Sequence, residues 1–178
     1  MTRVITFILS LIFLALTLLL SACTYTVGGD STMHHVAAWT GAQEWSKPGC
    51  GWTGNHGYPS PCTIPLNPPN TDRVILGVSI WDADAPDYSA YRHVTNYYNA
   101  HGAEVIWVAV PEMTGSFEDY RTLRSTNAAV AAELGCDLAP WRTRWVNGEM
   151  LSDNIHYTDH GARLVAERFE TLKSPVCR

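Results

Sequence analysis

The sequence has 178 residues, of which 46% are hydrophobic and 16% are charged, a balance that fits one folded domain and excludes a disordered chain. With 17 acidic residues, 12 basic residues and no basic run, its formal net charge is −5. This pattern excludes nucleic-acid binding through a basic patch and disfavours loose attraction to anionic lipid headgroups.

The N-terminus is typical of an export signal. A short basic start precedes an apolar run over residues 4–20, and the small residues after it lead to Cys23, as in a bacterial lipobox. We expect a signal peptide over residues 1–22 and a domain over residues 23–178, lipid-anchored through Cys23 to the outer face of the membrane. Two alternatives remain, a plain cleaved signal and a retained membrane anchor. The apolar run is at the short limit for a membrane-spanning helix, which needs about 17–25 residues.

A strand-to-helix turn follows. Residues 24–27 form a short β-type run that ends in two glycines and Asp30, and Ser31 begins a helical pattern. Such a turn holds a serine hydroxyl at the end of a sheet, beside backbone N–H groups that can stabilise an oxyanion. Ser31 is therefore a candidate nucleophile and its own N–H a candidate oxyanion donor. The alternative is an ordinary helix N-cap.

Residues 33–45 predict the first helix, interrupted by Gly41. His34 and His35 lie close to the candidate nucleophile, but adjacent helical residues point about 100° apart and do not readily share one ion. We interpret them as ordinary helix residues, or at most as substrate-lining residues.

The five cysteines support export. If Cys23 takes a lipid, four remain, an even number that suits an oxidising compartment. The expected pairs are Cys50–Cys62, which would close the long polar loop over residues 47–70, and Cys136–Cys177. Three connectivities are possible, and the sequence alone does not choose between them.

The rest of the chain alternates strands and helices. Strands are predicted at residues 73–80, 104–110 and 136–138, and helices at residues 88–101, 117–134 and after Thr158, the last with Leu164, Val165, Phe169 and Leu172 on one face. This order implies a parallel sheet with helices on both faces and a site at the carboxyl ends of the strands.

Asp153 lies three residues before His156, so one short loop can carry both a general base and the carboxylate that orients it. A metal site built from His156, Asp159 and His160 is the alternative, disfavoured because adjacent residues at a helix start point apart. We expect neither a metal nor a cofactor.

Together, Gly29-Asp30-Ser31 and Asp153-x-x-His156 resemble the first and last blocks of the SGNH (GDSL-type) hydrolase family. The resemblance implies an α/β fold, a flavodoxin-like three-layer α/β/α sandwich with a small parallel sheet. It also implies acyl chemistry by a triad of Ser31, His156 and Asp153.

A narrower similarity is to SGNH domains of actinobacterial envelope acyltransferases and esterases. It rests on Gly49-Cys50-Gly51, Trp81-Asp82, the run over residues 121–127 and Cys136-Asp137-Leu138. The family's second-block glycine, an oxyanion donor, corresponds to Gly49 or Gly51. The third block departs from the family pattern, because residues 79–82 read Ser-Ile-Trp-Asp and lack its oxyanion-donating asparagine. The Trp81 indole N–H or the Ser79 hydroxyl is a candidate substitute.

The N-terminal pattern and the resemblance together lead us to expect an exported serine esterase or O-acyltransferase, a monomer that acts on acyl esters such as acylated envelope sugars. Water as acceptor gives an esterase, and a sugar hydroxyl gives a transferase. The missing asparagine motivates the alternative, a catalytically inert envelope-binding protein with the same fold.

Overall fold

The computed structural model describes residues 25–54, 62, 71–110, 120–139, 156–169, 171 and 172. In this part of the chain, four parallel strands form one sheet in the order β2-β1-β3-β4. The strands are β1 (Tyr25–Gly28), β2 (Gln43–Glu44), β3 (Arg73–Gly77) and β4 (Glu104–Val108). The chain adds β2 on one side of β1 and then β3 and β4 on the other side, which is the strand order of the flavodoxin-like fold. The change of side creates a crevice at the carboxyl ends of the strands.

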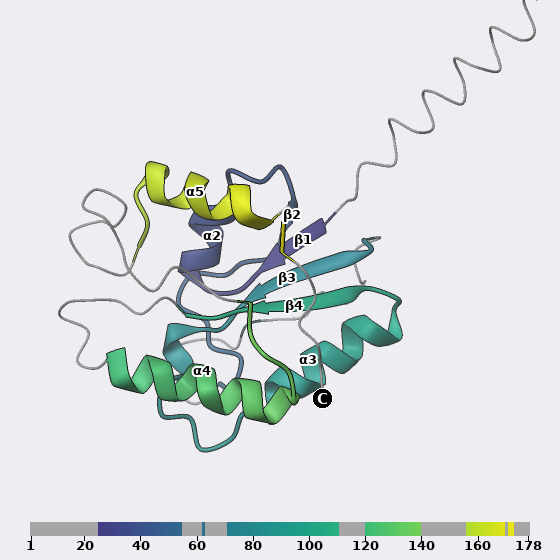
Figure 1. Ribbon diagram of the computed structural model, residues 1–178, viewed down its shortest axis with the longest axis vertical. Coiled ribbons are helices and arrows are strands. Elements are labelled where there is room, and N and C mark those ends of the chain that lie inside the picture. The colour runs from purple at the N-terminus through teal and green to yellow at the C-terminus, as the bar shows by residue number, and fades with distance from the viewer. Residues whose placement is uncertain are drawn as a thin grey trace, which may run out of the picture.

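Helices cover both faces of the sheet (Figure 1). One layer contains α2 (Ser31–Ala37) and α5 (Asp159–Phe169), and the other contains α3 (Ser89–Ala100) and α4 (Tyr120–Leu134). The fold expected from the sequence, a three-layer α/β/α sandwich with a small parallel sheet, is therefore confirmed.

The alternation of side chains along the strands builds the two cores. In β3, Val74 and Leu76 pack with Tyr91 of α3, whereas Ile75 packs with Val36 and Met33 of α2. Successive strand residues point to opposite faces, so a nearly continuous apolar run is what a doubly covered strand requires. The same packing fixes the loops that follow the strands.

The helix predicted over residues 33–45 is wrong in its second half. Helix α2 ends at Ala37, the chain turns through Gly41 with a φ of 63°, and Gln43–Glu44 form β2. The edge of β1 offers backbone partners, and Thr26 and Val27 pair in parallel with the two residues of β2. Glycine tolerates the positive φ that this turn needs.

Two of the predicted strands are shorter in the structure than expected from the sequence. The strand expected over residues 73–80 stops at Gly77, because Ser79 caps a 3₁₀ turn, η1 (Ile80–Asp82), through a bond from the Trp81 N–H. The short strand expected at residues 136–138 is reduced to one parallel bridge, between Val108 and Ala139.

Among the described residues, no helix combines the length and the apolar character needed to cross a membrane. The predicted signal over residues 1–22 and the predicted lipidation site, Cys23, lie outside those residues.

Candidate active site

The turn after β1 presents Ser31 at the start of α2. Asp30 is the N-cap of this helix, and its Oδ1 accepts the Thr32 N–H at 2.9 Å and the Thr32 hydroxyl at 2.6 Å. Gly29 precedes it with a φ of 145°, and a Cβ there would lie 2.7 Å from Met33 Cγ. Since Asp30 supplies the cap, the hydroxyl of half-buried Ser31 is not needed for capping.

His156 meets this serine from the other end of the chain. Its Nε2 lies 2.9 Å from Ser31 Oγ, although 125 positions separate the two residues. The neighbouring Tyr157 is 1% exposed in the core between α2 and α5, which holds the His156 backbone in place. The distance allows a hydrogen bond through which a hydroxyl proton can pass to an imidazole. Asp153, the predicted orienting carboxylate, lies outside the described residues.

The two histidines of α2 have different surroundings. The His35 ring lies beside that of His156, with centroids 5.4 Å apart and planes inclined by 46°. His34 instead pairs through Nδ1 with the carboxylate of Glu44 on β2, and half of its side chain is exposed. The two histidines could not be distinguished from the sequence, because it does not show on which side of α2 the distant His156 lies.

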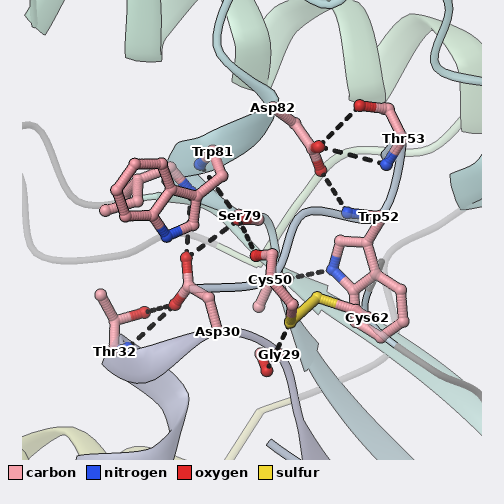
Figure 2. Close-up of a disulfide and its surroundings, with 12 residues drawn as sticks. Gly29, Asp30, Thr32, Cys50, Trp52, Thr53, Cys62, Ser79, Trp81 and Asp82 are labelled. Atoms are coloured by element: carbon pink, nitrogen blue, oxygen red, sulfur yellow. Dashed lines mark hydrogen bonds between the residues drawn. A yellow bond between two sulfur atoms is a disulfide. The ribbon is translucent and has the colours of Figure 1, made fainter. Parts of the chain in front are cut away.

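The second oxygen of Asp30 ties the nucleophile turn to the loop after β3. Asp30 Oδ2 accepts the Ile80 N–H at 3.1 Å and lies 3.1 Å from Ser79 Oγ (Figure 2). Burial raises the pKa of Asp30, and hydrogen bonds from Thr32, Ile80 and Ser79 offset part of that shift. A buried carboxyl bonded to two turns fixes their relative position.

A disulfide joins a third segment to these turns. Cys50 and Cys62 form the pair predicted for this loop. Ser79 Oγ lies 2.8 Å from the Cys50 carbonyl oxygen, so Ser79 sits between Asp30 and the disulfide (Figure 2). Cys136 is also disulfide-bonded, and its predicted partner, Cys177, lies outside the described residues.

Asp82 holds the chain just after Cys50. Its carboxylate accepts the Trp52 N–H at 2.9 Å, the Thr53 N–H at 3.1 Å and the Thr53 hydroxyl at 2.7 Å. The Tyr91 hydroxyl donates to the same carboxylate at 2.6 Å. Burial raises the pKa of Tyr91 well above its usual value, and the charge of Asp82 adds to the effect, so the phenol remains a donor.

The predicted oxyanion donors occupy the segments that this network joins. Gly51 packs so closely on η1 that a Cβ would lie 2.5 Å from Asp82 Oδ1 and 3.4 Å from Trp81 Cβ. Gly49 has a φ of 73°, and a Cβ at this position would meet nothing within 4 Å. Trp81 is half-buried, and its backbone N–H donates to Ser79 Oγ at 3.1 Å. Their roles as donors remain predictions.

Trp52 belongs to the hydrophobic core. Its indole donates to the Gly77 carbonyl at 2.9 Å, and its ring packs edge-on against Trp107 with centroids 5.3 Å apart. The hydrogen bonds between Asp82 and Tyr91 and between Asp30 and Ser79 were not predicted from the sequence. For Asp82 one signal was present, because an acidic residue follows the buried apolar run that begins at residue 73.

Within the described ranges, no group of three or more His, Cys, Asp or Glu side chains is placed to hold a metal ion. At the Ser31–His156 pair, the hydroxyl and the imidazole are close enough to transfer a proton between them.

No family model and no curated protein matches the sequence. Among solved structures, a GDSL-like lipase from Bacteroides thetaiotaomicron is similar, with a TM-score of 0.59 at 12% identity over 84% of this chain and 86% of that chain. A second similar structure is the C-terminal catalytic domain of peptidoglycan O-acetyltransferase A from Streptococcus pneumoniae, solved with a methylsulfonyl adduct. Its TM-score is 0.55 at 18% identity, over 84% of this chain and 92% of that chain. These likenesses confirm, for the fold, the resemblance to GDSL-type (SGNH) proteins.

Proposed function

From the fold shared with a GDSL-like lipase and an O-acetyltransferase domain, we propose that this protein is a serine acyl-ester hydrolase or O-acyltransferase. The observation that carries the proposal is the 2.9 Å distance between Ser31 Oγ and His156 Nε2. A serine hydroxyl within hydrogen-bond distance of a histidine nitrogen is what nucleophilic acyl transfer requires, and the carboxyl edge of a parallel sheet is where such sites lie in α/β folds.

In the proposed reaction, Ser31 Oγ attacks the ester carbonyl while His156 Nε2 takes the hydroxyl proton. The tetrahedral intermediate collapses, His156 returns the proton to the departing alcohol, and an acyl-serine remains. An acceptor hydroxyl then gives its proton to His156 and attacks the acyl group. As this second intermediate collapses, His156 returns the proton to Ser31 Oγ, which restores the free serine. Asp153 is proposed to orient His156 through Nδ1, as the Asp153-x-x-His156 spacing favours.

The negative oxygen of the intermediate needs donors. We assign this role to the Ser31 N–H at the start of α2 and to the N–H of Gly49 or Gly51, with the Trp81 indole as the candidate third donor. The α2 N-terminus supports the first assignment, because its N–H groups carry partial positive charge toward the site.

The proposed substrate class is supported by one structural neighbour and by the N-terminal signal pattern. One neighbour is a peptidoglycan O-acetyltransferase domain, and the sequence pattern before Cys23 resembles the signal of an exported lipoprotein. We therefore propose an acylated envelope sugar as substrate of a monomer anchored through Cys23 at the outer face of the membrane. Water would complete an esterase cycle, and a sugar hydroxyl a transferase cycle.

The second candidate is an inert envelope-binding protein. Two backbone N–H groups in the loop that lacks the family asparagine already donate to protein acceptors: Ile80 N–H donates to Asp30, and Trp81 N–H donates to Ser79. These groups are therefore not available to an oxyanion, which favours an inert protein. Loss of one oxyanion donor lowers the rate by about 10²–10³-fold.

A fluorophosphonate probe separates the two candidates. We expect the full-length protein to be labelled at Ser31, identified by peptide mass spectrometry, because the probe reacts with a serine whose proton a base can remove. Labelling should disappear in Ser31→Ala and slow at least about 10²-fold in His156→Ala.

Ser89→Ala is the matched control, since Ser89 also begins a helix, α3, but is exposed and bonds Asp87. It should be labelled at the wild-type rate. Folded wild-type protein that takes no label would overturn the enzyme proposal and favour the inert one.

A further inference from the structure

His35 is the described side chain whose ring packs against that of the proposed general base. It lies one helical turn after Ser31 on α2, so both side chains are on the same side of that helix. The His35 and His156 ring centroids are 5.4 Å apart. His35 is half-buried at this contact, as is His156.

The imidazole of a general base needs more than hydrogen bonds at its two nitrogens. The ring is joined to the backbone through Cβ, and rotation about the Cα–Cβ and Cβ–Cγ bonds can still turn it if the hydrogen bonds stretch or bend. Such rotation moves the Nε2 lone pair away from the serine proton. A packed neighbouring ring opposes this motion, and aromatic pairs at centroid distances of about 4.5–7 Å attract each other beyond simple burial.

The backbone on both sides of the contact is fixed. Val36 of α2 and Val165 of α5 lie in one buried cluster, to which Tyr157 also belongs. Helix α2 therefore carries Ser31 and His35 as one rigid unit, and the segment just before α5 brings His156 against both. The serine sets the position of Nε2, and His35 limits the tilt of the ring.

We propose that His35 is a positioning residue that holds the His156 imidazole in line with Ser31 Oγ. The inference rests on the proposed function, because it assigns His35 to the same acyl-transfer site. The ring of His35, and not its ability to titrate, carries this role. We do not assign this role to His34, because its side chain pairs with the carboxylate of Glu44.

The test compares His35→Ala, His35→Phe and His156→Ala in the full-length protein with p-nitrophenyl acetate. Each kcat is divided by the fraction of protein that fluorophosphonate labels at the end point, which removes unfolded molecules from the comparison. His156→Ala, which labels slowly, is normalised to folded protein measured by circular dichroism. His93→Ala is the control, an exposed histidine on α3 in the opposite layer.

We expect His35→Ala to lower kcat about tenfold with KM nearly unchanged, since small misplacements of a catalytic group carry large rate penalties. His35→Phe, which keeps a ring at the contact, should stay within about twofold of wild type. His93→Ala should match wild type, and the thermal midpoints of all variants should show that they fold.

Three results would overturn the inference. A wild-type kcat in His35→Ala, with activity lost in His156→Ala, removes the role of His35 and leaves the proposed function standing. Equal losses in His35→Ala and His35→Phe would mean that a polar contact, not the ring, matters. A wild-type kcat in His156→Ala would overturn the proposed function and this inference together.

Discussion

Ser31→Ala is expected to lower the turnover of p-nitrophenyl acetate by about 10³-fold or more while the fold persists. The substitution removes the oxygen that lies 2.9 Å from His156 Nε2 and leaves no atom to form the acyl intermediate. The helix start should survive, because the Asp30 carboxylate and not the serine caps α2. Steady-state kinetics and far-ultraviolet circular dichroism measure the two effects.

The control for this experiment is again Ser89→Ala, which removes a hydroxyl from the first residue of another helix. Its turnover should equal that of wild type. If Ser31→Ala instead turns over the ester at the wild-type rate, the hydrolysis comes from another group, and the assignment of Ser31 fails.

Asp82→Ala is expected to lower the free energy of unfolding by about 3–5 kcal/mol, because it leaves buried donors without their acceptor. Asp82 is 0% exposed, and its carboxylate accepts bonds from Trp52, Thr53 and Tyr91. Urea unfolding with the disulfide intact would measure the loss as a lower midpoint.

Asp87→Ala is the matched control for Asp82→Ala. Asp87 also accepts from a backbone N–H and a hydroxyl, both of Ser89, but it is exposed to solvent. Water can replace those bonds, so its effect should be much smaller. Equal midpoints for Asp82→Ala and wild type would show that the carboxylate does not hold the segment after Cys50.

Asp30 and Asp82 connect different pairs of segments around the site. Asp30 ties the nucleophile turn to the loop after β3, and Asp82 ties that loop to the segment after Cys50. Removal of the Asp82 carboxylate should therefore also loosen Gly51, which packs directly against it. If Gly51 donates to the oxyanion, a fall in kcat will accompany the loss of stability.

The local features of the site could be predicted from the sequence because they depend on neighbours in the chain. The glycines and Asp30 before Ser31 specify a sharp turn and a capped helix start, whatever lies around them. The alternation of apolar runs also predicted the parallel sheet and its two helical layers, since burial on both faces requires it.

Residues 33–45 show where such reasoning fails. Helical periodicity continues past Ala37, but Gln43–Glu44 gain backbone partners along β1, and the Gly41 turn lets the chain reach them. Pairing with a strand edge is a contact between segments, so local propensity does not report it.

The sequence by itself determined the order of the helices and of strands β1, β3 and β4, the turn that carries Ser31, and the presence of a histidine before the last helix. Only the tertiary structure decided that His156 Nε2 reaches Ser31 Oγ, that His35 and not His34 lies beside it, and that Asp82 binds the disulfide segment. The physical reason is the range of the forces involved. Turns and caps follow from bonds between near neighbours, whereas side-chain partners follow from how α2, α5 and the loop after β3 pack on one sheet.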